Sequence, residues 1–404
     1  MILNIILEYK WVILFYSSIV LLVYLNRKKL KNEAPFVYLY KTKFGISLMK
    51  FFAEKFNKAV KIFGYISIFL SYIGLLFISF MLIKNSYDLI ISKPNAVGGS
   101  PVIPGLPIAG LGITFPLVIG WISLFIIMIV HEFSHGIVAK AHNVKIKTTG
   151  IAFFGPILGA FVEPDEKNLK KQSDKVQLSI FSAGPISNVF LWIVCIVLMF
   201  GLGSIISNIT YADGVKIGII NNETLPAYSA GIKHGSIIIE IDNEKIRNLS
   251  DLENSLNDLK PEQEIFLKIR ENETIKEIKL KTAKNPKNET KAYLGILLLN
   301  EERKLKNNSF INNIFYKILL WFYELFSWTG FISINIGLIN LFPIFITDGA
   351  QILRKNFETL FKKNKELGLK IWKNINITGL LIIGIMLFLP MIRNIVNMIF
   401  KILF

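Results

Sequence analysis

Long runs of apolar residues without a single charged side chain constrain the fold of this chain more than any other feature. The five clearest runs are residues 64–83, 113–130, 176–206, 325–347 and 374–392. A helix rises about 1.5 Å per residue, so about 20 apolar residues cross the hydrocarbon of a bilayer. With 52% hydrophobic and only 19% charged residues, the chain is also too apolar for a soluble globular protein of 404 residues. We therefore expect a multi-pass α-helical membrane protein.

A sixth candidate span lies near the beginning of the chain. Residues 5–25 include Glu8 and Lys10, but the segment from Trp11 to Asn26 carries no charge. Its cations follow the apolar run, whereas a secretory signal peptide has them before it. We therefore expect a retained anchor and about six transmembrane helices in all.

The cations of the loops predict an orientation. Residues 26–61 hold ten Lys and Arg, residues 140–175 hold seven and residues 354–373 hold seven, but residues 84–114 hold only two. Because Lys and Arg collect in cytoplasmic loops, this pattern predicts an extracytoplasmic N-terminus and three cytoplasmic basic loops in a cell-membrane protein. The cations occur in short blocks rather than on one basic face, which argues against a nucleic-acid partner.

The segment between residues 211 and 308 differs in kind from the rest because it is rich in charge. Its strand-like runs are residues 215–220, 236–241, 265–269 and 274–280. A helical stretch is expected at residues 249–259, opened by Ser250, a candidate N-cap with Glu253 three residues later. The pattern predicts a small α+β domain inserted between two spans, on the extracytoplasmic side.

The sequence His131-Glu132-Phe133-Ser134-His135 ends one apolar run and is the sharpest chemical signal. Positions i and i+4 of a helix share a face, so both imidazoles can reach one metal ion while Glu132 reaches water beside it. A pair of buried histidines without a metal is the alternative. A Glu within a spanning helix costs roughly 2.5 to 3.5 kcal/mol without partners, which favours a metal site. The single cysteine, Cys195, excludes a thiolate cluster.

A catalytic zinc site usually has three protein ligands and water, so one ligand is missing. Asp348 is the best candidate because it ends an uncharged run on the side of the membrane where His135 is expected. Its alternative role is to cap the helix that begins at Gly349. Three acidic residues of a cytoplasmic loop are further candidates: Glu163, Asp165 and Asp174. His142 and His234 are expected to be ordinary solvated histidines.

Three motifs, in order over residues 113–355, resemble the site-2 protease family of intramembrane zinc metalloproteases, peptidase family M50. They are the HExxH helix, Ser182-Ala-Gly-Pro-Ile-Ser-Asn188, and Asn340-Leu-Phe-Pro343-Ile-Phe-Ile-Thr-Asp348-Gly349. The resemblance implies one Zn²⁺ per chain, with His131, His135 and Asp348 as ligands. It implies Glu132 as the catalytic carboxylate.

Four further residues are predicted to bind substrate or to line the cavity. Asn340 matches the family's asparagine near the substrate, and Asn188 matches a position with either a packing or a chemical role. Pro343 predicts a broken helix, which lipid tolerates only against protein or a water cavity. Gly155 belongs to the apolar stretch 149–164, which is similar to the family's membrane re-entrant β-hairpin. Such an edge could bind a substrate by strand addition; a loop packed on the interior is the alternative.

The inserted segment resembles a PDZ domain. The sequence from Ala227 to Asp242 contains Ala-Gly-Ile-x-x-Gly, but Ser236 replaces the usual Asp, and Asp242-Asn243-Glu244 replaces the usual Asn-Gly turn. A PDZ fold holds extended peptides at a sheet edge. The resemblance therefore implies a domain that binds substrate tails or excludes bulky ectodomains.

These observations predict five regions. They are an N-terminal two-helix membrane region (1–112), the first part of the catalytic membrane core (113–208), the PDZ-like domain (209–305), the second part of the core with the Asp-Gly motif (306–355), and a cytoplasmic loop with a final transmembrane helix (356–404).

The function predicted from the sequence is hydrolysis of peptide bonds within or near the transmembrane segments of membrane proteins. The partners would be transmembrane proteins or peptides and the lipid bilayer; the oligomeric state is left open. A metal-handling transporter is one alternative, and it would place ionisable residues on several spans. A catalytically inactive scaffold that displays a PDZ domain is the other, and it would not need Glu132.

Overall fold

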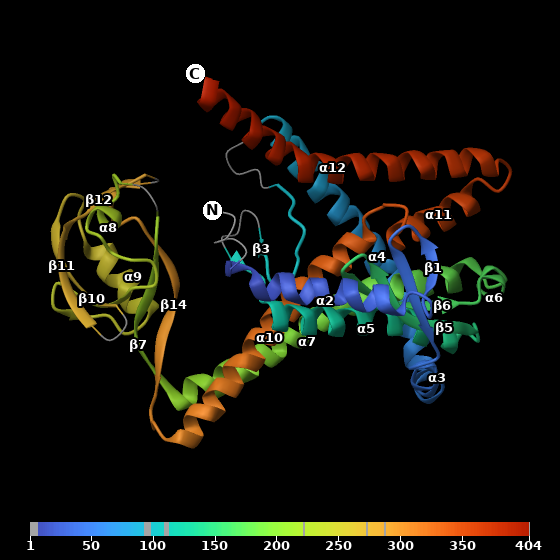
Figure 1. Ribbon diagram of the computed structural model, residues 1–404, viewed down its shortest axis with the longest axis horizontal. Coiled ribbons are helices and arrows are strands. Elements are labelled where there is room, and N and C mark those ends of the chain that lie inside the picture. Colours follow the sequence, from blue (N-terminus) through green and yellow to red (C-terminus); the bar gives the residue numbers. More distant parts are fainter. Residues whose placement is uncertain are drawn as a thin grey trace. The chain divides into compact units, whose positions relative to one another are not determined.

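The structure is a computed structural model that describes residues 7–92, 98–108, 113–220, 223–271, 274–286 and 288–403. The chain forms two compact units (Figure 1). The first comprises Met1–Met199 and Phe322–Phe404, and the second is Phe200–Trp321. Each unit is described below by itself.

Among the described residues, five helices are long and apolar enough to cross a membrane, as expected for a membrane protein. They are α4 (Asn57–Ile90), α5 (Leu117–Ala141), α7 (Asp174–Ile209), α10 (Phe310–Leu341) and α12 (Lys365–Leu403), the last through its segment Lys365–Arg393. The sixth predicted span is represented by α2 (Lys10–Asn26), a shorter apolar helix of 17 residues. That α2 crosses the bilayer stays a prediction.

Helix α10 ends earlier than the predicted run 325–347, and Pro343 is the physical reason. The residue before a proline is disfavoured in the α conformation, so the helix stops at Leu341. The chain resumes as α11 (Asp348–Leu360), whose N-cap is Thr347. The interpretation of Asp348 as the helix cap was therefore wrong, because Asp348 occupies the first turn.

An antiparallel sheet of four strands belongs to the first unit. Its order is β1 (Lys31–Ala34), β2 (Val37–Thr42), β5 (Ile146–Phe154) and β6 (Ile157–Pro164). Strands β5 and β6 form a hairpin that turns at Gly155, whose φ of 60° lies in the region that favours glycine. The stretch 149–164 is thus paired backbone, and β6 is an edge strand. That this hairpin enters the membrane stays a prediction.

The remaining elements of the first unit are short. They are α3 (Ile46–Lys55), β3 (Pro107–Ile108), β4 (Ile113–Thr114) and α6 (Glu166–Lys170). A glycine allows close helix packing at one point of this unit. A Cβ added at Gly64 of α4 would lie 3.1 Å from Val138 of α5 and 3.3 Å from Ser179 of α7. The helices α4, α5 and α7 therefore approach one another closely at Gly64, Val138 and Ser179.

The second unit is built on a six-stranded sheet. The main path is β11 (Thr274–Lys281), β10 (Glu264–Glu271), β8 (Ile237–Ile241), β7 (Thr210–Ile219) and β14 (Ile296–Leu305), with β9 (Glu244–Lys245) paired to β8. The hairpin of β12 (Ala283–Asn285) and β13 (Asn288–Tyr293) and the helices α8 (Pro226–Ser229) and α9 (Leu249–Asp258) complete it. Ile217, Ile238 and Leu267 are fully buried in its apolar core.

Four of these strands correspond to the predicted runs, but one helix cap was predicted at the wrong residue. The side chain of Asn248, not Ser250, accepts a hydrogen bond from the backbone N–H of Asp251 at 2.8 Å. Both residue types are good caps, so the choice depends on where the backbone leaves the extended conformation.

Candidate metal centre

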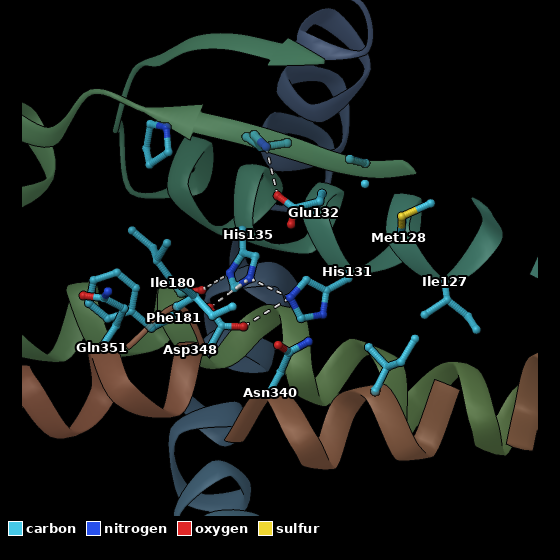
Figure 2. A pocket seen from close by; sticks show the side chains of 16 residues that line it. Ile127, Met128, His131, Glu132, His135, Ile180, Phe181, Asn340, Asp348 and Gln351 are labelled. Carbon is cyan, nitrogen blue, oxygen red and sulfur yellow. Dashed lines mark hydrogen bonds and ion pairs between the residues drawn. The ribbon is translucent and has the colours of Figure 1, made fainter. Parts of the chain in front are cut away.

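Three side chains that can bind a metal converge at one point of the first unit (Figure 2). His131 and His135 lie one turn apart on α5, and Asp348 begins α11. Nε2 of His131 lies 3.1 Å from Oδ2 of Asp348, and Nε2 of His135 lies 3.4 Å from Oδ1. The two Nε2 atoms are 3.2 Å apart. One ligand atom from each residue therefore lies within 4.8 Å of the others.

The break between α10 and α11 brings Asp348 to this point. Thr347 Oγ1 accepts a hydrogen bond from Ala350 N and donates to the carbonyl of Phe342 at 2.7 Å, which closes a tight connection. A Cβ added at Gly349 would overlap the backbone of Leu341. The Asp-Gly pair thus allows the chain to fold back closely on the end of α10.

His135 is held in the orientation that a metal ligand requires. Its Nδ1 donates to the carbonyl oxygen of Ile180 in α7 at 2.6 Å. A neutral imidazole carries one N–H, so this bond leaves the Nε2 lone pair free to face Asp348 and His131. Metal-binding histidines commonly donate their other N–H in this way.

The space around the two imidazoles fits an ion because Gly184 of α7 has no side chain. A Cβ at this position would overlap Nε2 of His135 and lie 2.6 Å from Nε2 of His131. Two imidazole nitrogens and one carboxylate are a donor set typical of catalytic zinc. The residues of this centre therefore fit zinc in both donor type and available space.

Glu132 lies beside the cluster and is hydrogen-bonded to the four-stranded sheet. Its Oε2 accepts a hydrogen bond from the backbone N–H of Val162 in β6 at 2.9 Å. Glu132, Asn340 and the three side chains of the candidate metal cluster line a cavity of about 370 Å³. Its other lining residues are Ile127, Met128, Gly159, Ala160, Val162, Pro164, Ile180, Phe181, Ile336, Ile346 and Gln351. The edge strand β6 thus forms one wall of the cavity that holds the centre.

Three other predicted cavity residues lie elsewhere. Asn188 is fully buried in α7, and Pro343 is buried in the connection after α10. Gly155 forms the turn of the hairpin. None of the three is among the residues that line the described cavity.

The alternative third ligands are engaged with other partners. Glu163 pairs with Lys41 at 2.7 Å, Asp165 caps α6, and Asp174 pairs with Lys355 at 2.8 Å. Their positions leave Asp348 as the acidic member of the described cluster.

The two remaining histidines differ from each other. His234 is exposed, as a solvated residue should be. His142 was predicted to be solvated, but its Nε2 is buried without a partner among the described residues, and its ring lies 5.6 Å from that of Tyr65. The prediction for His142 was wrong because the end of α5 packs against α4.

One protein family and two curated proteins are similar to part of this chain. Residues 119–385 match the family model of Peptidase family M50. An uncharacterised protein of Methanocaldococcus jannaschii is 30% identical over 291 residues, which cover 71% of this chain and 70% of that protein. A protein of Clostridium acetobutylicum, named as a candidate zinc metalloprotease, is 26% identical over 195 residues, which cover 41% of this chain and 53% of that protein.

Two solved structures are similar to part of the chain. They are the PDZ domains of SdrC-like proteins from Listeria innocua and Listeria monocytogenes, with 23% and 18% identity and a TM-score of 0.20 in each case. Each match covers 22% of this chain, and 98% and 88% of the respective domain.

The family match spans more than half of the chain and contains the HExxH helix, both partner motifs and the cavity. With apolar helices long enough to cross a membrane and a centre that fits zinc, this chain belongs to peptidase family M50 and is an intramembrane zinc metalloprotease.

Proposed function

We propose that His131, His135 and Asp348 hold the zinc ion of this protease and that Glu132 transfers the protons of the reaction. The observation that carries the proposal is the convergence of the three ligand atoms within 4.8 Å, next to Glu132 and in one cavity. When bound, zinc acidifies water and polarises the carbonyl of a peptide bond.

Glu132 has the geometry of a general base that is held at one oxygen. Because Val162 N–H binds Oε2, Oε1 is left to accept the proton of the attacking water. The water oxygen bonds to the peptide carbon, and the C–N bond then breaks. Glu132 returns its proton to the leaving amine nitrogen, so one carboxylate serves both halves of the hydrolysis.

We further propose that a substrate segment binds as an added strand along β6. Val162 N–H points away from β5 because it binds Glu132, and residues two apart in a strand point to the same side. The backbone groups of Ala160 are therefore available at the same edge, and Ala160 lines the cavity. A transmembrane substrate must uncoil locally before its peptide groups can pair in this way.

The loop cations support the proposed orientation, with the N-terminus and the PDZ-like domain outside and the centre towards the cytoplasm. Cys195 is the single cysteine and is buried. In a variant with one added cysteine, labelling by a maleimide therefore reports the accessibility of the added cysteine. Lys29→Cys should react with a membrane-impermeant maleimide only after the cytoplasmic face is opened, and Lys233→Cys from outside. The reverse pattern would overturn the orientation.

Cleavage of a transmembrane peptide by the purified protein in liposomes tests the role of Glu132. Glu132→Gln should keep about one zinc per chain and lose about 10²- to 10⁴-fold in turnover, the usual contribution of acid–base catalysis. Ser134→Ala is the matched control, because Ser134 lies in the same motif but outside the cavity lining. Unchanged turnover in Glu132→Gln would remove Glu132 from the mechanism.

A further inference from the structure

Asn188 is a buried amide that contacts a metal-binding residue but not the cavity. It lies on α7 with no exposed surface, and its Nδ2 lies 3.1 Å from Nδ1 of His131. Its Oδ1 is also buried and has no hydrogen-bond partner in the described part of the chain. An unpaired buried carbonyl oxygen is costly, so this amide needs a physical explanation.

The contact selects one tautomer of His131. With the amide nitrogen of Asn188 donating, Nδ1 accepts, and the single proton of the neutral ring is on Nε2. That proton is then donated to Oδ2 of Asp348, 3.1 Å away. The hydrogen bonds from Asn188 through His131 to Asp348 are thus self-consistent when Nε2 carries a proton.

Metal binding requires the other tautomer. A metal at Nε2 takes the lone pair there, so the neutral ring must carry its proton on Nδ1 and donate it. Rotation of the Asn188 side chain by about 180° exchanges the positions of Nδ2 and Oδ1, the two nearly isosteric ends of an amide. Oδ1 then accepts from Nδ1–H, and Nδ2 takes the position that Oδ1 occupied.

We propose that Asn188 is a positioning residue that holds the imidazole of His131 in both tautomers, with amide rotation accompanying zinc binding. The proposal rests on the assignment of His131 as a zinc ligand. An amide suits this task because it has both a donor and an acceptor at the same distance. A carboxylate could serve only the zinc-binding tautomer, and an aliphatic side chain could serve neither.

The backbone of Asn188 is held in place by α10. Ser333 Oγ donates to the main-chain carbonyl of Asn188 at 2.9 Å. A Cβ added at Gly337 would lie 2.8 Å from the carbonyl oxygen of Pro185 and 3.1 Å from Cβ of Asn188. With the main chain fixed by this close crossing, rotation about the side-chain bonds is the motion left to the amide.

Zinc affinity, measured by competition with a chelator in detergent solution, tests the proposal without using cleavage. Asn188→Leu should weaken zinc binding about 10- to 100-fold, the usual effect of losing a hydrogen bond to a metal-binding histidine. Asn188→Asp should keep the affinity within a few-fold of the wild type, because its carboxylate accepts from Nδ1–H. The absorption spectrum of the cobalt-loaded protein should likewise change in the leucine variant and be retained in the aspartate variant.

Asn376→Leu is the matched control. Asn376 is equally buried and also has an unpaired Oδ1, but its Nδ2 donates to the carbonyl of Trp372 within α12. Its zinc affinity should equal that of the wild type.

Wild-type affinity in Asn188→Leu would overturn the proposal. Equal loss of zinc in Asn188→Asp and Asn188→Leu would also overturn it, because packing alone would then explain the position. The aspartate variant decides the question if the leucine variant does not fold. A wild-type protein without zinc would contradict the metal centre itself, which is a different result.

Discussion

Gly184 lets α7 approach the face of α5 that carries His131 and His135, since a side chain at this position would overlap the two imidazoles. Both imidazoles already have partners on α7, through Ile180 and Asn188. The geometry of the centre therefore depends on the close approach of the α7 backbone to α5, as well as on His131, His135 and Asp348.

Replacing Gly184 by alanine should displace zinc. The added methyl group would overlap Nε2 of His135, so we expect zinc affinity to fall by at least about 10-fold, with a parallel loss of cleavage. Gly201→Ala is the control on the same helix, because a Cβ there meets nothing within 4 Å. Full zinc content in Gly184→Ala would show that α7 can move away from α5 without cost.

The sequence singled out the residues of the candidate metal cluster more readily than the residues that position them. His131, Glu132 and His135 form a local motif, and Asp348 was found because it ends an uncharged run. Gly184 belongs to a motif that was recognised, but its role depends on the distance between two helices. No local pattern encodes that distance, which is why the contacts of Ile180 and Val162 were also missed.

At the scale of elements, the sheet joins two distant parts of the chain. Strand β2 pairs with β5 over six residues, from Val37 opposite Phe154 to Thr42 opposite Thr149. Lys41 of β2 reaches across β5 to Glu163 of β6, which also accepts from Thr148 Oγ1 at 2.7 Å. Because β6 forms a wall of the cavity, this ion pair ties the basic N-terminal loop to the site.

The strands β1 and β2 were not predicted from the sequence. They form a short hairpin in a stretch rich in Lys, which is not typical of strands. The other partner of β2 is β5, about a hundred residues away, so that pairing is not visible in a local pattern. The hairpin of β5 and β6 was easier to predict, because Gly155 separates two apolar runs.

Removal of the Glu163 carboxylate should loosen this sheet slightly. The hydrogen bonds from Lys41 and then Thr148 lower the pKa of Glu163, so the stabilisation is present above the usual pKa of Glu and is lost as the pH falls through the lowered value. Glu163→Gln should speed amide hydrogen exchange in β2 and β5 at neutral pH by up to about fivefold, since such partly exposed pairs contribute at most about 1 kcal/mol.

The control for this prediction is Glu166→Gln, because Glu166 pairs with Lys170 on an exposed face of α6. Its exchange rates should match the wild type. Equal exchange in Glu163→Gln and in the wild type would mean that the ion pair does not stabilise the sheet.

At the scale of the whole molecule, the chain combines two units that bury their apolar side chains in different ways. The first depends on lipid for the burial of its apolar helices, whereas the second has its own apolar core around Ile217, Ile238 and Leu267. The change from uncharged runs to charge-rich sequence made this division predictable. The number of spans was harder to predict, because α2, with 17 residues, has about the minimum length of a helix that crosses a bilayer.

The second unit should fold without the rest of the chain. A fragment of residues 210–305, which holds the whole six-stranded sheet, should unfold cooperatively in urea. Ile238→Ala should lower its free energy of unfolding by about 2–5 kcal/mol, because Ile238 is fully buried. A fragment without a cooperative transition would mean that this core needs the helices that flank it.

Metal analysis of the purified protein tests the central claim most directly, since the proposed zinc ligands come from two distant parts of the chain. The wild type and Glu163→Gln should each hold about one zinc, as expected for a single mononuclear site. Asp348→Ala should hold far less, because two imidazoles alone bind zinc weakly in competition with a chelator. A full equivalent of zinc in Asp348→Ala would contradict the account.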